Sequence, residues 1–248
     1  MLTKDRAVCI RTVDYSETSQ IVTFFARLSG KIGAIAKGSK RSKSAFDGPI
    51  EVLSFGAVVF ASSSREKLAT LTEFQPHPVR GGLRRHLFAL HSALFAAELL
   101  GLLTDEYDPH LVLFDHFVQL LQDLEQEDLA GDRRAVMIRL ILFQLLLLRE
   151  VGLRPVVDRC ANCKTPVSRH WRQVYFSSAA NGLICRDCEM SYPDKVRLTA
   201  ASLRGWTDVK AIPQLRDKAL EEMEGVLIHH FTETLGRRPK MAGHILTG

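Results

Sequence analysis

The stretch from Gln20 to Ala36, QIVTFFARLSGKIGAIA, contains two short runs rich in Val, Ile, Phe and Thr with Gly30 between them. Runs of this length and composition, punctuated by glycine, are typical of β-strands. We therefore predict strands over residues 20–28 and 31–36. The same pattern recurs on both sides of this stretch, and it predicts further strands over residues 7–13, 51–62 and 67–74.

Five strands in about the first 75 residues suit a small closed barrel. The five-stranded OB-fold is the commonest such barrel, although an SH3-like barrel would give a similar pattern. We expect an OB-fold over residues 1–80, which forms the β part of an α+β protein.

After Pro76, Pro78 and Gly81-Gly82, apolar residues recur at the three- and four-residue spacings of helices. We expect a helical domain over residues 81–155 that continues over 196–248, with a different segment inserted at 156–195. The predicted helices cover residues 87–99, Asp108 (as N-cap) to Leu124, Asp132 to just before Gly152, a short stretch from Thr199, and Pro213 to Gly236.

The inserted segment carries two Cys-x-x-Cys pairs, Cys160/Cys163 and Cys185/Cys188, separated by 21 residues. Two such pairs fill the four positions of a tetrahedral Zn²⁺ ion and leave none open for water or substrate. We therefore expect one structural Zn²⁺ per chain in a zinc-ribbon-like element, with a strand over residues 172–176 and a turn at Asn181-Gly182. Redox disulfides are disfavoured because no βαβ unit surrounds either pair.

Positive charge is concentrated near the start of the chain. Residues 1–85 carry 14 Lys or Arg and 7 Asp or Glu, so they sum to +7 in a chain whose total is +5. Residues 98–132 carry ten acidic side chains and no Lys or Arg, as expected for a charged outer face or, alternatively, a protein-binding surface.

Four cations lie within residues 37–43, KGSKRSK, and no carboxylate occurs between Glu17 and Asp47. An isolated charge run is usually a solvated loop, but a barrel face that carries one can neutralise several phosphates. We expect phosphate contacts from the loop residues Lys37, Lys40, Arg41 and Lys43, supported by Lys31, Arg84 and Arg85. Phe24, Phe25 and Phe46 could stack on bases, although aromatic residues in strands more often belong to a core.

Other functional classes find little support. Gly33 to Lys40 resembles a phosphate-binding loop, but Lys and Ser are in the wrong order and no helix pattern follows. A metal-dependent nuclease or deaminase would need an open metal position, which four cysteines do not leave. The longest apolar run, near 140–148, is too short for a membrane span. We therefore expect a non-enzymatic protein with no membrane partner. Because the sequence shows no secretory signal, we expect it to be cytoplasmic.

Several segments together resemble the RecO family of bacterial DNA repair and recombination mediators. They are Asp14-Tyr15-Ser16-Glu17-Thr18 with Ile21–Phe25, Gly30-Lys31, residues 36–44, and residues 147–155 running into the cysteine pairs. The family often ends in a basic stretch containing Lys-Ser-Arg, whereas here Arg237-Arg238-Pro239-Lys240 is followed by Met241.

The resemblance implies an N-terminal OB-fold and a helical C-terminal domain with a zinc element. It also implies binding of single- and double-stranded DNA at the nucleoid and annealing of complementary strands. With RecR, such a protein would help RecA load onto DNA coated with single-strand-binding protein. Some family members lack the cysteines, so the zinc site would not be needed for the shared function. The alternative is a zinc-ribbon transcription or translation factor, in which the ribbon itself contacts nucleic acid or a polymerase.

Overall fold

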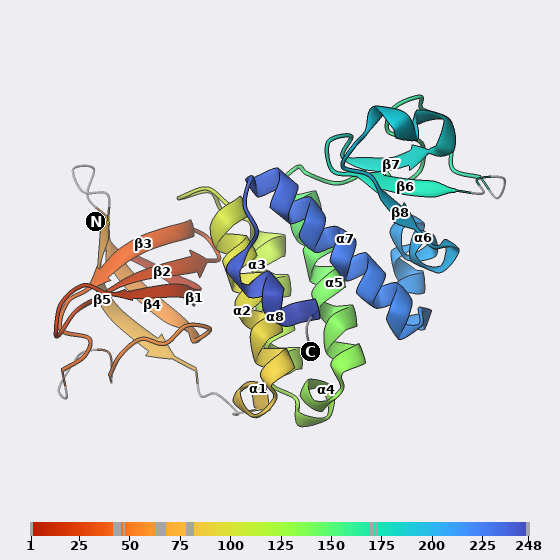
Figure 1. Ribbon diagram of the computed structural model, residues 1–248. Helices are drawn as coiled ribbons and strands as arrows, with labels where there is room; N and C mark the ends of the chain where they lie inside the picture. Colours follow the sequence, from red (N-terminus) through yellow and green to blue (C-terminus); the bar gives the residue numbers. More distant parts are fainter. Residues whose placement is uncertain are drawn as a thin grey trace. The chain divides into compact units, whose positions relative to one another are not determined.

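The computed structural model describes residues 2–41, 46, 48–62, 68–77, 82–168, 171 and 173–246. Lys43, which the sequence places in the basic loop, lies outside these residues, as does Arg172 at the start of a predicted strand. The chain divides into two compact units, Met1–Gly131 and Asp132–Gly248, whose elements are labelled in Figure 1.

A closed five-stranded barrel forms the start of the first unit. Its strands are β1 (Leu2–Asp14), β2 (Gln20–Ala26), β3 (Gly30–Ala36), β4 (Phe55–Ala61) and β5 (Ala69–Pro76). They follow the order β1-β2-β3-β5-β4, and β4 pairs back onto β1. The β3–β5 pair is parallel and the other pairs are antiparallel. The predicted five-stranded OB barrel is confirmed.

The interior of the barrel follows from period-two alternation along the strands. Val22 and Phe24 of β2 point inward with Ile32 of β3, and all three are fully buried. Cys9 is buried in the same core, as expected of a small apolar residue, and burial raises the pKa of its thiol to about 12.

Four helices belong to the same compact unit as the barrel: α1 (Gly82–Arg85), α2 (Leu87–Leu103), α3 (Leu111–Leu124) and α4 (Glu127–Gly131). The sequence predicts a domain boundary after residue 80, but these helices pack against the barrel. Phe25, which points outward from β2, is fully buried with its ring 6.1 Å from that of Phe114 on α3. Helix α2 lies against β1.

The predicted N-cap of α3 at Asp108 is wrong, since the cap residue is His110. Asp108 is held instead against Gly30, where a Cβ would lie 2.3 Å from the Asp108 carbonyl oxygen. The neighbouring Tyr107 donates its N–H to the carbonyl of Lys31 at 3.0 Å and has a φ of 58°. Residues 107 and 108 are therefore held against the start of β3, and α3 begins after them.

The second unit consists of helices and a small sheet. Its α-helices are α5 (Arg133–Glu150), α6 (Ala200–Thr207), α7 (Asp217–Leu235) and α8 (Gly243–Leu246). Its 3₁₀ helices are η1 (Arg186–Ser191), η2 (Val209–Gln214) and η3 (Lys240–Ala242). The sheet has the order β7-β6-β8, from β6 (Val174–Ser177), β7 (Gly182–Cys185) and β8 (Val196–Leu198).

Most predicted helix ends in this unit are confirmed. Asp132 caps α5 by accepting from the N–H groups of residues 134 and 135, and Thr199 caps α6 through Ser202. Gly236 ends α7 in the left-handed conformation, with a φ of 64°. The predicted start of α7 at Pro213 is wrong, because that proline lies within η2 and the helix begins at Asp217.

Candidate metal centre and DNA interface

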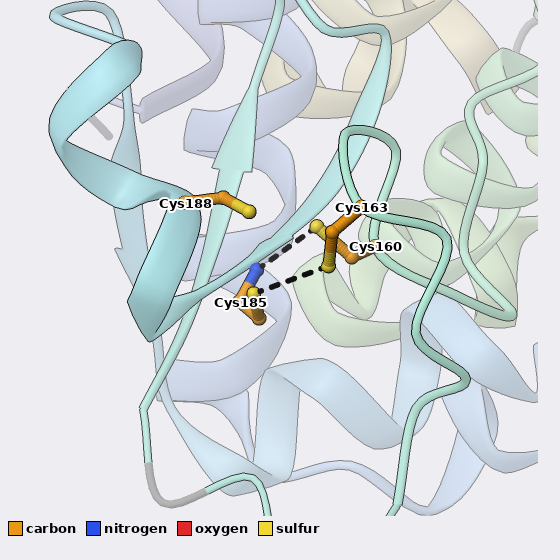
Figure 2. A group of neighbouring side chains, drawn as sticks. All are labelled: Cys160, Cys163, Cys185 and Cys188. Carbon is orange, nitrogen blue, oxygen red and sulfur yellow. Dashed lines mark hydrogen bonds between the residues drawn. The ribbon is translucent and has the colours of Figure 1, made fainter.

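Four cysteines converge in the second unit, as Figure 2 shows. Cys160 and Cys163 come from a turn before the sheet, Cys185 ends β7, and Cys188 lies on η1. All four sulfur atoms lie within 4.8 Å of one another, and those of Cys163 and Cys185 are 3.7 Å apart. A tetrahedral ion with ligands at about 2.3 Å places neighbouring sulfurs about 3.8 Å apart. The predicted four residues therefore form a cluster that could hold one metal ion.

Close contacts between backbones bring the two cysteine pairs together. A Cβ on Gly182 would lie 2.4 Å from the carbonyl oxygen of Val156, so only glycine allows this approach. The backbone of Val156 bonds to Asn181 and Leu183, and Ala161 donates to the carbonyl of Leu183 at 2.7 Å. The predicted hairpin with a turn at Asn181-Gly182 is confirmed, and it carries Cys185 to the first pair.

Polar neighbours surround the sulfur atoms. The Cys163 sulfur lies 3.2 Å from the Thr165 hydroxyl, and hydrogen bonding there lowers the pKa of Cys163 to about 6. Asn162 donates from its side chain to the Cys188 sulfur at 3.2 Å, and Tyr192 donates to Asn162. Burial raises the pKa of Cys185 to about 12. These supporting residues were missed in the sequence because no spacing rule marks them.

The start of the basic loop, residues 37–41, is bonded to the turn between β1 and β2. Gly38 donates its N–H to the Ser19 hydroxyl at 3.2 Å, and Lys40 donates its N–H to the carbonyl of Thr18 at 3.1 Å. The Lys40 ammonium also pairs with Asp14 at 2.6 Å. We call residues 37–41 the basic segment. It is therefore a positioned part of the barrel surface.

The remaining cations of the basic segment are open to solvent. Lys37 and Arg41 are exposed, and neither side chain has a hydrogen bond or ion pair with any residue that the structure describes. Asp14, the partner of Lys40, was missed because it precedes the carboxylate-free stretch by several residues. Two exposed cations without a partner among the described residues, and one cation paired with Asp14, thus share a short surface segment.

The structure gives Lys31 a different role from the predicted phosphate contact. Its ammonium donates to the carbonyl oxygen of Gly101 at 2.9 Å and to that of Thr104, at the C-terminal end of α2. Burial lowers the pKa of Lys31. A lysine that donates hydrogen bonds to the last carbonyls of a helix stabilises the fold, so its ammonium is not available to a phosphate. We therefore leave it out of the interface.

Arg84 and Arg85 are exposed but paired. Arg84 contacts Glu51, and Arg85 lies 3.4 Å from Glu127. Exposed ion pairs of this kind are weak, so a phosphate can replace the carboxylate. These two arginines remain supporting members of the predicted interface.

The three phenylalanines considered for base stacking all lie in the core. Phe24 and Phe46 belong to the barrel interior, and Phe25 is covered by Phe114. They cannot stack on bases without opening the fold. The core interpretation of these strand aromatics is correct.

Part of the acidic stretch also serves the fold. Asp115 on α3 accepts two hydrogen bonds from the Arg27 guanidinium, at 2.8 and 3.0 Å, and these bonds lower the pKa of that carboxyl.

Among the residues that the structure describes, none of the helices combines the length and apolar character needed to cross a bilayer.

Comparisons with known proteins cover both units. The N-terminal model of recombination protein O matches residues 1–78, and its C-terminal model matches residues 84–241. The chain is 34% identical to the DNA repair protein RecO of Rhodopirellula baltica over 84% of this chain and 73% of that protein. It is 30% identical to RecO of Bacillus pumilus over 95% of this chain and 90% of that protein. It is also 30% identical to RecO of Bacillus subtilis over 82% of this chain and 75% of that protein. The chain therefore belongs to the RecO family of DNA repair proteins.

Proposed function

We propose that this chain is a non-enzymatic DNA-binding recombination mediator. In this role it binds single- and double-stranded DNA, anneals complementary strands and, with RecR, assists RecA loading on DNA coated with single-strand-binding protein. The observation that carries the proposal is the basic segment on an OB barrel, where Lys37 and Arg41 are exposed beside Lys40 and have no partner among the described residues. The family supports the same role. A protein with this role works in the cytoplasm, at the nucleoid.

The mechanism is electrostatic. Cations that contact phosphates release condensed counterions, which gives affinity without sequence preference. Neutralising the charge of two strands lowers their repulsion, so complementary sequences can approach. Lys43 is part of the predicted loop and belongs to the proposal, although it lies outside the described residues.

The four cysteines fit Zn²⁺ as a structural ion. The donor set is all thiol, the sulfur spacing matches a tetrahedron, and three of the four side chains are buried. Bound zinc would hold the turn at residues 160–163 to β7 and η1, and would supply no reaction chemistry. In this proposal the ribbon stabilises the second unit while the barrel binds DNA.

The test replaces Lys37, Lys40 and Arg41 by alanine in the full chain and measures binding to single-stranded DNA at several salt concentrations. Each lost phosphate contact lowers the slope of log affinity against log salt by about 0.7, so we expect a decrease of about two. Strand annealing, with and without single-strand-binding protein, should slow in parallel.

A matched control replaces three exposed cations of the ribbon, Arg159, Lys164 and Arg186, by alanine. The proposal expects these changes to leave the salt slope nearly unchanged. If the ribbon variant lost the slope and the basic-segment variant kept it, the chain would act through its ribbon, as a zinc-ribbon transcription or translation factor does.

A further inference from the structure

The outer surface of β1, β2 and β3 is arranged in rows of cross-strand neighbours. Thr23 on β2 pairs with Arg11 on one side and Gly33 on the other. In the next row, Ile21 pairs with Val13 and Ile35. Alternate residues of a strand point to the same face, so these two rows share the outer side of the barrel. We call them the outer wall.

One end of this face is covered and the other is open. Beyond the Thr23 row, Phe25 pairs with Lys31. The Phe25 side chain packs against α3, and the Lys31 side chain donates a hydrogen bond to α2. Arg11 and Val13 are exposed, Val13 by 43%, and Ile21 and Ile35 are half-buried. The open end is therefore an apolar strip with a cation at its side. It leads toward the basic segment, because Lys37 follows Ile35 by two residues.

Tyr15 stands at this open end. It follows Val13 by two residues, its N–H donates to the carbonyl of Ser19 at 3.0 Å, and its side chain is 63% exposed. The turn that carries it also accepts the N–H groups of Gly38 and Lys40. Asp14, the preceding residue, pairs with Lys40. The backbone of Tyr15 is thus held in the same turn that binds the basic segment, and its aromatic side chain is exposed.

We propose that Tyr15 stacks on an unpaired base of single-stranded DNA whose phosphates bind Lys37, Arg41 and Arg11, with the outer wall as its floor. Single-stranded nucleic acid requires a cationic track beside an aromatic face, and both occur here. The inference rests on the proposed function, because it adds base stacking to the same DNA interface.

The proposal predicts how the site separates single strands from duplexes. In a duplex the base faces are already stacked, so an aromatic side chain at the surface gains no contact with them. The cations act on either form, whereas Tyr15 acts on single strands alone. Loss of Tyr15 should therefore remove part of the preference for single strands while leaving the electrostatic part intact.

The experiment compares Tyr15→Ala and Tyr15→Phe in the full chain, using a labelled thymidine oligomer and a duplex of equal length as probes. Base–aromatic stacking is worth about 1–3 kcal/mol, so Tyr15→Ala should weaken single-strand binding by about 5- to 150-fold. Tyr15→Phe should bind like the natural protein. Duplex affinity and the salt slope should not change.

A second readout places 2-aminopurine within the oligomer. Its fluorescence should be quenched on binding to the natural protein and to Tyr15→Phe, and less so on binding to Tyr15→Ala. Tyr107→Ala is the matched control, since Tyr107 is 48% exposed in the same unit and lies beside the covered end of the wall. It should leave both readouts unchanged.

Unchanged single-strand affinity in Tyr15→Ala, or an equal loss for duplex, would overturn the inference. Failure of the proposed function gives a different result, namely an unchanged salt slope when the basic segment is neutralised. The two outcomes are measured on separate variants, so one can fail while the other holds.

Discussion

Three of the four clustered cysteines are buried, whereas Lys37 and Arg41 of the basic segment are exposed. The sulfur atoms of the cysteines lie within 4.8 Å of one another; Asn162 donates a hydrogen bond to Cys188, and Cys163 donates one to the Thr165 hydroxyl. The two cations face solvent, with no partner in the part of the chain that the structure describes. Both regions stand out in the sequence as clusters of one residue type.

The difference shows what each cluster is suited to do. Four thiols that face one another would fill all four positions of a tetrahedral ion, so the bound ion would stabilise the fold and offer no open position. Exposed cations that lack a partner among the described residues can instead bind an anion at little cost. The following predictions test this contrast, beginning with the largest expected effect.

Cys185→Ser should release zinc and destabilise the second unit. Metal binding is coupled to local folding in sites of this type, so we expect a loss on the order of several kcal/mol. Zinc content and thermal unfolding measure the effect, and DNA binding should persist in protein that is still folded. Cys9→Ala is the control, because Cys9 is buried in the barrel and should keep the zinc content unchanged. A Cys185→Ser protein that kept its zinc would contradict the four-cysteine site.

The second unit also contains a buried acid whose effect depends on pH. Glu224 is fully buried and accepts a hydrogen bond from the Gln144 amide at 2.7 Å, and burial raises its pKa to about 8. The other side-chain oxygen of each residue lacks a partner among the described residues. A proton on Glu224 supplies the missing donor, so the neutral acid is the form that the fold accommodates.

The sign of the pH dependence follows from this shift. Between the ordinary glutamate pKa and about 8, the folded protein holds a proton that the unfolded chain has lost. The free energy of unfolding therefore falls as pH rises through that window. Glu224→Gln keeps an uncharged amide there and should flatten the fall, which makes the variant more stable at about pH 8.5 by roughly 1–3 kcal/mol. Parallel denaturation curves for both proteins at every pH would contradict the assignment.

Lys31 and Lys37 provide a matched pair at the barrel. Lys31→Met removes an ammonium from the end of α2 and should lower the free energy of unfolding by about 1 kcal/mol, with no change in the DNA salt slope. Lys37→Met should leave stability unchanged and lower the slope by about 0.7. Chemical denaturation and salt titration separate the two effects. The contrast would break if Lys31→Met lowered the slope as much as Lys37→Met.

This pair also shows how far the sequence predicts the structure. The strands of the barrel and the cysteine cluster are predictable because local alternation and ligand spacing determine them. The role of Lys31 is not, because its partners, Gly101 and Thr104, lie some 70 residues away along the chain. Burial of Phe25 likewise depends on α3, which no local pattern places against β2. The contacts of residues with distant partners are what the sequence alone does not predict.

The smallest expected effect concerns Arg84. Its partner Glu51 and Arg84 itself are about equally exposed, at 59% and 60%, so the pair contributes little to stability. Glu51→Gln removes the competing carboxylate and should raise DNA affinity by about two- to threefold at low salt, because one more cation is free for phosphate. The gain should vanish at high salt, and a Glu51→Gln/Arg84→Ala double variant should lose it. If the single variant bound DNA no better than the natural protein at low salt, Arg84 would not belong to the interface. The exposed cations of the basic segment would then make the phosphate contacts, with Arg85 as the remaining supporting residue.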